Sequence, residues 1–260
     1  MKYIDPGQID QLPGKQIKPG ERFAFRCHSQ LACFNQCCRN LNLFLYPYDV
    51  LCLKDHLKLS SDQFIDEYVD VVLREGHHFP EVLLRMSESE GHPCPFLSEE
   101  GCRVYTARPH TCRLFPVEQG VYFNAEKEDA KPLYFFRPPE FCHGPEEPHT
   151  MSVDEYLRDQ NALAHFKMNL KWAKVRQLFG NDPWGLEGPQ GAKAKMAFMA
   201  AYNIDRFREF IFNSSFFKRY HVKSTLVKQM RRSDKALLEF GFEWIRVFVW
   251  GQPSRQMRVK

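Results

Sequence analysis

Cysteine is the residue type in this sequence whose number and spacing best suit chemistry. Four cysteines fall between Cys27 and Cys38, in the stretch CHSQLACFNQCCRN. Three more lie in CPFLSEEGCRVYTARPHTCRLFP, and another lies in FCHGP. Thiolates are soft ligands, and a structural zinc ion or an iron–sulfur cluster is commonly held by four of them. The spacing therefore predicts metal binding. The predicted ligands are Cys27, Cys33, Cys37, Cys38, Cys94, Cys102, Cys112 and Cys142.

The remaining cysteine and the Cys-Cys doublet bear on the number of sites. Cys52 lies at an apolar position of a predicted helix, in DVLCLKDHL, and is interpreted as a small buried hydrophobic residue. Side chains of adjacent residues diverge, to opposite sides on an extended backbone. Cys37 and Cys38 therefore fit one tetrahedral site poorly and two sites well. Eight thiols taken four at a time predict two sites that share the doublet.

The intervals between cysteines favour iron–sulfur clusters over zinc. Structural zinc sites usually contain short C-x2–4-C knuckles, whereas the intervals here include five, seven and nine residues. A proline follows Cys94, and others lie near Cys112 and Cys142, as prolines do near ferredoxin cysteines. We therefore expect an iron–sulfur cofactor, as many as two [4Fe–4S] clusters, with zinc as the alternative.

The sequence also indicates in which cellular compartment the protein is expected. The first residues, MKYIDPGQIDQLPGKQIKPGERF, lack the apolar core of a signal peptide, and the chain contains no apolar run of about 20 residues that would span a membrane. We therefore expect a cytoplasmic protein whose thiols stay reduced. A disulfide framework is the alternative, and it requires an export route that the sequence does not show.

Charged residues beside the cysteines suggest how a thiolate site would be balanced. Five arginines in this otherwise acidic region are candidates for compensating the negative charge of thiolates, or alternatively for a solvated surface. These are Arg26, Arg39, Arg103, Arg108 and Arg113. Four histidines lie within two residues of a cysteine and are expected to donate hydrogen bonds around the site or to face solvent. These are His28, His92, His110 and His143.

The chain is strongly asymmetric in charge. Residues 1–157 contain 16 Lys and Arg against 24 Asp and Glu, whereas residues 158–260 contain 20 against 8. A basic half of this kind is suited to an acidic protein or nucleic-acid partner. It is equally suited to docking on the acidic half of the same chain. We favour docking, because the basic residues alternate with large apolar ones at helical spacing.

The elements expected around the cysteines define a mainly α fold with a small irregular and β component, of the α+β class. We predict a turn-rich cysteine-cluster metal module packed against a C-terminal helical bundle. Capping boxes begin helices at Ser60 and Ser152, and Gly251 ends the last helix. The predicted domains are an irregular arm (1–20), the cysteine-cluster module (21–150) and a basic, aromatic-rich helical region (151–260).

Apolar periodicity gives the expected elements in more detail. An apolar stripe from Phe64 to Val72 predicts a helix through Val72, and a second stripe predicts one helix from the Ser152 cap to Gly180. Two short strands are expected on either side of a turn at Gln119-Gly120, with a third in PLYFFR. The remaining expected elements are a helix from Tyr46 to about His56, a strand over 81–86, and helices over 192–212 and 224–250.

The cysteine motifs are similar to those of a known family. CxxxxxCxxxCCR, CPFL…GCRVYTARPHTCRLFP and FCHG resemble the YkgJ family of cysteine-cluster proteins, described as zinc- or iron-chelating. The resemblance covers residues 23–145 and implies the same eight ligands. Two departures are present: the gap after Cys27 is longer than in the common form of the family, and His143 stands where many members have proline.

Three functions remain open on these observations. The first is a metal-binding protein that works in electron transfer, redox sensing or metal handling. The second is a protein lysine N-methylase-like enzyme, because some members of the resembled family are associated with flagellin lysine methylation. The third is a structural zinc module that mediates interactions. The radical-SAM motif C-x3-C-x2-C fails at Asn40, and no P-loop, GxSxG or dinucleotide fingerprint is present, so no catalytic residue is assigned.

Overall fold

The chain folds into two compact units that interleave along the sequence. The structure is a computed structural model, and it describes residues 2–4, 6–124 and 129–260. Unit 1 comprises Met1–Leu43 and Arg85–Ala173, and unit 2 comprises Phe44–Leu84 and Lys174–Lys260. The sequence predicted contiguous domains instead. The difference arises because residues 44–84 contact the C-terminal helices rather than the cysteine segments on either side of them.

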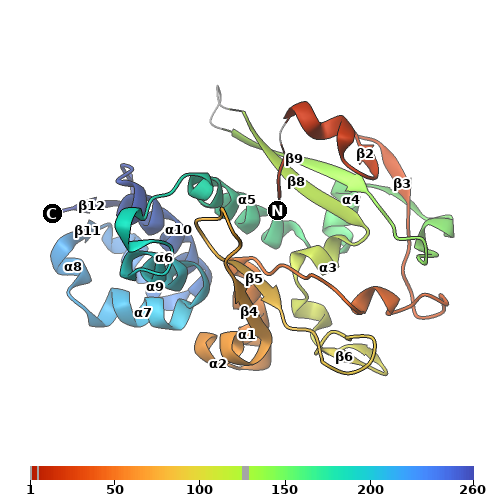
Figure 1. Ribbon diagram of the computed structural model, residues 1–260, viewed down its shortest axis with the longest axis horizontal. Coiled ribbons are helices and arrows are strands. Elements are labelled where there is room, and N and C mark those ends of the chain that lie inside the picture. Colours follow the sequence, from red (N-terminus) through yellow and green to blue (C-terminus); the bar gives the residue numbers. More distant parts are fainter. Residues whose placement is uncertain (1, 5, 125–128) are drawn as a thin grey trace. The chain divides into compact units, whose positions relative to one another are not determined.

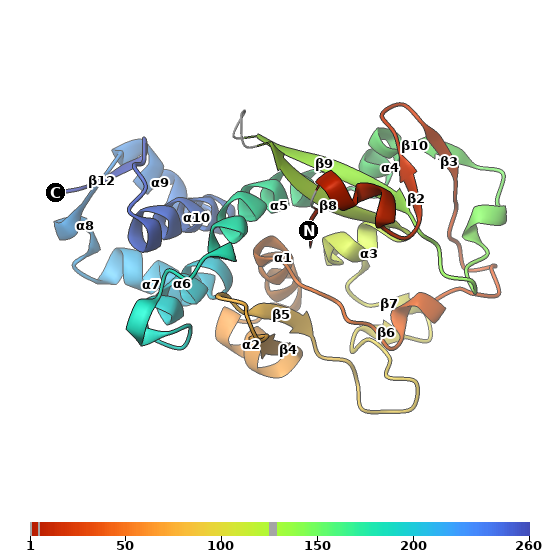
Figure 2. The ribbon, with the colours of Figure 1, turned by 45° about the horizontal axis from the view of Figure 1, so that its top comes forward.

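Unit 1 is built on a four-stranded sheet of order β1-β8-β9-β2. Strands β8 and β9 form its long antiparallel pair, β2 adds to β9, and β10 pairs with β3 beside the sheet (Figures 1 and 2). The strands of unit 1 are β1 (Lys2–Tyr3), β2 (Lys15–Ile17), β3 (Arg22–Ala24), β6 (Leu97–Ser98), β7 (Gly101–Cys102), β8 (Val117–Asn124), β9 (Asp129–Phe136) and β10 (Thr150–Ser152).

The helices of unit 1 are short. Most are single turns, which leaves the cysteine segments largely in turns and loops. They are η1 (Pro6–Gln11), η2 (Gln36–Cys38), η3 (Tyr105–Ala107), α3 (His110–Leu114), η4 (Gly144–Glu146) and α4 (Val153–Asp159), followed by α5 (Leu163–Arg176), which ends in unit 2.

Unit 2 is mainly helical. Its longest helix, α10, contacts α1, α6, α7 and α9. The helices are α1 (Pro47–Leu57), α2 (Ser61–Tyr68), η5 (Gln177–Gly180), η6 (Gly185–Glu187), α6 (Ala192–Tyr202), α7 (Ile204–Asn213), α8 (Phe216–Arg219), α9 (Ser224–Arg232) and α10 (Asp234–Trp250). The strands form two antiparallel pairs, β4 (Val69–Val72) with β5 (Glu81–Leu84) and β11 (Tyr220–Val222) with β12 (Met257–Val259).

The mixed α+β class is confirmed, with about 47% of residues in helices and 18% in strands. The predicted caps at Ser60 and Ser152 form capping boxes, and Gly251 ends α10 in the left-handed conformation that favours glycine. No helix within the described ranges is long and apolar enough to cross a membrane.

Several predicted element boundaries were wrong. The helix expected through Val72 ends at Tyr68, because the β-branched run VDVV forms β4. β8 runs without a turn through Gln119-Gly120. Two predicted long helices are interrupted where Asn203 and Ser233 accept backbone N–H groups and begin new helices. The helix expected up to Gly180 is broken between α4 and α5, and residues 15–17, expected to be irregular, form β2.

Candidate metal centre

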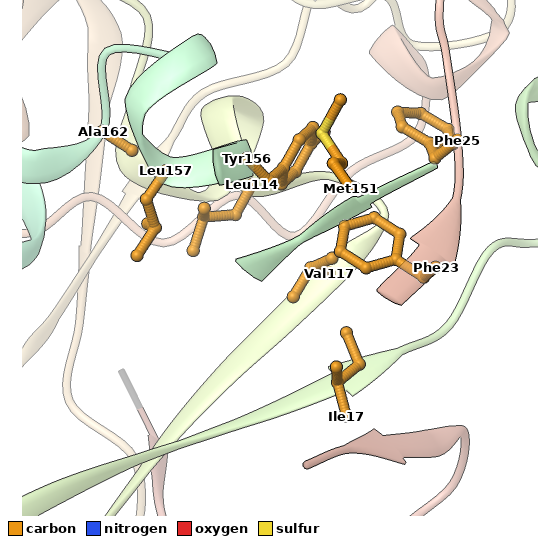
Figure 3. Packing of buried hydrophobic residues seen from close by; sticks show 9 residues of the cluster. All are labelled: Ile17, Phe23, Phe25, Leu114, Val117, Met151, Tyr156, Leu157 and Ala162. Carbon is orange, nitrogen blue, oxygen red and sulfur yellow. The ribbon is translucent and has the colours of Figure 1, made fainter. Parts of the chain in front are cut away.

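A buried core in unit 1 anchors three of the cysteine segments. Phe25, two residues before Cys27, packs in one hydrophobic cluster with Leu114, two residues after Cys112 (Figure 3). The half-buried Cys142 packs against the same cluster. Tyr156 of α4 joins these parts, because its ring meets Phe25 edge-on with the ring centroids 6.0 Å apart. Residues distant in sequence thereby bring Cys27, Cys112 and Cys142 to one side of the unit.

Gly144 allows the segment of Cys142 to approach that of Cys27 closely. A Cβ at position 144 would lie 2.4 Å from the Phe25 ring and 3.1 Å from the carbonyl oxygen of Arg26. In this position the carbonyl oxygen of Gly144 accepts the backbone N–H of Arg26 at 3.0 Å. The backbone N–H of His143 donates to Sγ of Cys33 at 3.3 Å. Three of the predicted ligands, Cys27, Cys33 and Cys142, are thus connected through backbone groups.

The doublet segment is attached to the segment of Cys94. Asn35 adopts a positive φ of 66°, a conformation that asparagine tolerates, and the single turn η2 follows with both cysteines of the doublet. The carbonyl oxygen of Cys38 accepts the backbone N–H of Cys94 at 2.8 Å, and that of His92 accepts the N–H of Asn40 at 2.9 Å. These two bonds hold the doublet beside Cys94.

Cys102 lies at the end of a tight hairpin. β6 and β7 pair Leu97 with Cys102, and Gly101 occupies a positive φ of 119° that requires glycine. The backbone N–H of Leu97 donates to the carbonyl oxygen of Cys94 at 2.9 Å. The hairpin therefore folds Cys102 back toward Cys94.

The hydrogen bonds described above place the thiols in two groups, and Cys38 of the second group still raises the pKa of Cys27 in the first. In the first, the thiols of Cys33 and Cys142 are hydrogen bonded, and burial raises the pKa of Cys142. Cys27 is exposed at the surface, but partial desolvation raises its pKa, and the charges of Cys33, Cys142 and Cys38 raise it further. We call Cys27, Cys33 and Cys142 the first thiol group.

The second thiol group consists of Cys38, Cys94 and Cys102. Burial raises the pKa of Cys94 to about 11, and the charges of Cys38 and Cys102 contribute in the same direction. Burial likewise raises the pKa of Cys102, with Cys38 adding to the shift. The raised values indicate that the thiols of Cys94 and Cys102 are protonated at neutral pH when no cation is near.

Cys37 lies between the two groups. Its thiol is hydrogen bonded to that of Cys38; this bond, followed by burial, raises the pKa of Cys37, with further increases from Cys27 and Cys112. The same bond lowers the pKa of Cys38 to about 7, against the opposing effect of burial. The doublet therefore makes one thiol of the pair the preferred thiolate. It also connects Cys112 to the remaining thiols.

The eight predicted ligands all lie in unit 1, whereas Cys52 lies half-buried on α1 in unit 2. All nine cysteines lie in the described ranges, and none of them forms a disulfide there. Among the described residues, no three His, Cys, Asp or Glu side chains converge closely enough to hold a metal ion as they stand. The eight thiols nevertheless provide the donor chemistry that zinc or an iron–sulfur cluster requires, so the residues present fit such a group in kind and number.

The five arginines divide between two roles. Arg39 lowers the pKa of Cys38 by its charge, as Arg103 and Arg108 do for Cys102, although burial keeps the pKa of Cys102 raised. Arg108 is also a structural residue, since it bonds Gln160 and stacks over the Tyr105 ring. Arg113 is buried and donates to the carbonyl oxygens of Thr106 and Gln160, and Arg26 is exposed.

The four histidines near the cysteines have partners other than thiols. His28 lies 3.4 Å from Glu147, and His143 lies 2.9 Å from Glu146. His92 contacts the carbonyl oxygen of Ser87, and the buried His110 contacts Oε1 of Gln119 at 2.6 Å. These contacts agree with the expected role of hydrogen-bonding residues around the cysteines.

Sequence reasoning missed Gly144 as a residue that positions the candidate ligands. The sequence contained one indication: a glycine follows Cys142 closely in FCHG, and glycine is used where backbones approach. Phe25 and Tyr156 gave no indication of their own, because aromatic residues recur throughout the chain.

Residues 26–143 match a family model, CxxCxxCC, whose description is "Putative zinc- or iron-chelating domain". The matched range contains all eight predicted ligands and agrees with the cysteine-cluster resemblance. The comparison supports metal chelation by this part of the chain, and it does not distinguish zinc from iron. No solved structure matches the chain.

Proposed function

We propose that the cysteine-rich region binds two metal centres, one at each thiol group. The observation that carries this proposal is the collection of eight thiols from separate segments into one unit. Backbone bonds there hold the segment of Cys142 beside those of Cys27 and Cys33, and the segment of Cys38 beside that of Cys94. Each thiol group supplies three ligands. Cys37 and Cys112 are neighbours of one another, and each supplies the fourth ligand of one centre. If Cys37 completes the first centre, the doublet is divided between the two centres. If Cys112 completes the first centre, both thiols of the doublet belong to the second.

Metal binding must displace protons and draw the thiols together. Burial raises the pKa of several of these thiols, so a bound cation has to stabilise the thiolate form, and binding releases protons. Arg39, Arg103 and Arg108 assist, because their charges favour thiolates at Cys38 and Cys102. Sites of this kind are rarely preformed without metal, so the free energy of metal binding includes the free energy of bringing the ligands together.

We favour iron–sulfur clusters, as many as two [4Fe–4S], with zinc as the alternative. The long intervals between ligands and the nearby prolines support this choice. The proposed roles are electron transfer, redox sensing or metal handling. A cluster supplies one-electron chemistry, and the chain's own residues hold it, balance its charge and limit solvent access. A reducing compartment such as the cytoplasm would keep the thiols available for metal.

The test is metal stoichiometry in matched variants purified without oxygen. Iron, acid-labile sulfide and zinc are measured in the wild type, Cys33→Ser, Cys94→Ser and the double variant. Each single variant is expected to lose about half of the metal, and the double variant nearly all of it, because each thiol group holds one four-ligand centre. Cys52→Ser is the control, because Cys52 lies in the other unit.

Other stoichiometries decide against the proposal. Complete loss in each single variant would show one shared centre, and metal-free wild-type protein would refute metal binding. Stoichiometric zinc without sulfide or visible absorption would replace iron–sulfur clusters by zinc. A Cys52→Ser variant that loses metal would show that the ligand set is wrong.

A further inference from the structure

Unit 2 contains a cavity that the proposed metal chemistry does not use. Its volume is about 160 Å³, and its walls come from α6, α7, α8, β11 and α10. Ser214, Ser215 and Arg219 at its margin are exposed, whereas Phe216 and Trp244 are 2% and 0% exposed. The cavity therefore extends from the surface toward the core of the unit.

Aromatic rings form most of the wall. Trp244 and Phe248 stack with centroids 4.4 Å apart and planes within 10°, and Phe216 stacks on Tyr220 at 4.7 Å. Phe210 lies between these pairs, 5.4 Å from Trp244 and 5.7 Å from Phe216. Flat faces of this kind favour a planar ring as the occupant. A cavity of about 150 Å³ in another protein holds one benzene molecule, so the volume here suits a single ring.

One charged residue of the wall indicates what the ring would carry. Arg219 lines the cavity and is exposed at its margin. Its guanidinium takes part in none of the ion pairs between the described residues. A guanidinium at this position can therefore pair with an anionic group of a ligand.

The surrounding chain is positively charged. Between Glu209 and Asp234 the sequence has six Lys and Arg and no acidic residue. The basic residues of this segment include Lys218, next to Arg219, and Lys223, after β11. The local electrostatic potential therefore attracts anions to the mouth of the cavity.

We propose that this cavity binds a small aromatic carboxylate. The ring occupies the cavity against the aromatic side chains of its wall, and the carboxylate pairs with Arg219 at the margin. This binding site is independent of metal, because its lining residues all lie in unit 2 and the candidate ligands all lie in unit 1.

Calorimetric titration of the full chain with benzoate tests the proposal. Saturable binding is expected for benzoate, weaker binding for benzyl alcohol, which lacks the charge, and none for acetate, which lacks the ring. Arg219→Gln is expected to weaken benzoate binding at least tenfold and to leave benzyl alcohol binding unchanged. Arg232→Gln removes the same charge from a residue that does not line the cavity, and it is expected to bind benzoate like the wild type.

A cavity-filling variant locates the site. Met196→Trp places a large ring on the α6 wall and is expected to abolish binding of both aromatic probes. No saturable benzoate binding by the folded wild type would overturn the proposal. Equal affinity in Arg219→Gln, unchanged affinity in a folded Met196→Trp, or acetate binding as tight as benzoate would each overturn it as well.

Discussion

Lys54 and Asp205 show at the residue scale how unit 2 tolerates buried charge. The Lys54 side chain is 7% exposed, and its Nζ lies 2.9 Å from Asp55, 3.5 Å from Asp205 and 3.4 Å from Asp234. Burial alone would lower the pKa of Lys54, but the hydrogen bond to Asp55 and the three carboxylate charges raise it. The ammonium group is therefore charged at neutral pH, and these carboxylates stabilise it.

Asp205 connects Lys54 to the start of α2. Burial acts to raise the pKa of Asp205, but the N–H and O–H groups of Ser61 and the charge of Lys54 outweigh it and lower the pKa. The carboxylate accepts the Ser61 N–H at 2.7 Å and its hydroxyl at 2.9 Å. A lowered pKa means that the charged form stabilises the fold.

Replacing Asp205 by Asn is expected to destabilise unit 2 by about 1–2 kcal/mol, because the charged hydrogen bonds become neutral ones. The stabilisation is fully present above the ordinary pKa of 3.8 and is lost as pH falls through the lower folded value. The stability difference from the wild type should therefore be full at pH 7 and shrink below about pH 4. Urea unfolding at several pH values measures it.

Glu209→Gln is the matched control for Asp205→Asn. Glu209 lies on the same helix, but its side chain is 60% exposed and pairs with the exposed Arg206. Surface ion pairs of this kind contribute little. A stability loss in Glu209→Gln as large as that in Asp205→Asn, or a difference independent of pH, would contradict the role given to Asp205.

At the scale of elements, Gly144 controls how closely η4 approaches the segment of Phe25 and Arg26. It begins η4, and this turn follows directly after Cys142 and His143. Gly144→Ala would place a methyl group against the Phe25 ring and the backbone of Arg26, so the two segments must separate. Overpacking of this kind costs about 1–3 kcal/mol. Because separation moves Cys142 from Cys33, metal content should fall along with the melting temperature.

Gly180→Ala provides the control for this substitution. A Cβ at Gly180 meets no atom within 4 Å, and its φ lies outside the left-handed region. Both variants are compared by thermal unfolding and by metal analysis. Normal metal content and stability in Gly144→Ala would show that the close approach does not position Cys142.

Element ends were predictable where one residue type suits the end of a helix. The hydroxyls of Ser60 and Ser152 accept backbone N–H groups of the first turn, and Gly251 adopts the left-handed conformation that ends α10. Asn203 and Ser233 act in the same way, but the apolar stripes on both sides concealed the breaks between helices. Periodicity alone also failed at Val71 and Val72, since pairing with β5 decides their conformation.

At the scale of the whole molecule, the interleaving of the units is what the sequence could not reveal. It depends on long-range contacts such as that between the Tyr202 hydroxyl and the carbonyl oxygen of Leu45. The eight cysteines could be proposed as ligands, and two sites could be proposed for them, because thiol chemistry is visible residue by residue. Which cysteines lie near one another could not be predicted, since this depends on Gly144 and on the bond between Cys38 and Cys94.

Interleaving also accounts for part of the charge asymmetry. Residues 44–84 contain 3 basic and 8 acidic residues, and residues 174–260 contain 17 basic and 7 acidic residues. Both segments belong to unit 2. Arg206 pairs with Asp62 across them at 2.8 Å, and Asn203 donates to Asp62 at 2.7 Å. Part of the basic charge is therefore balanced within its own unit, whereas docking of residues 158–260 on the acidic half of the chain (1–157) stays a prediction.

The division into units predicts where metal removal acts. If all ligands lie in unit 1, a chelator should increase hydrogen exchange in residues 1–43 and 85–173 and leave residues 44–84 unchanged. The comparison is sharp because residues 44–84 lie between the two cysteine-rich segments in the sequence. A metal centre that organised a contiguous domain would loosen them as well. Exchange that rises equally in residues 36–43, 44–84 and 85–94 would contradict this prediction, whereas a sharp change at residues 43–44 and 84–85 would support it.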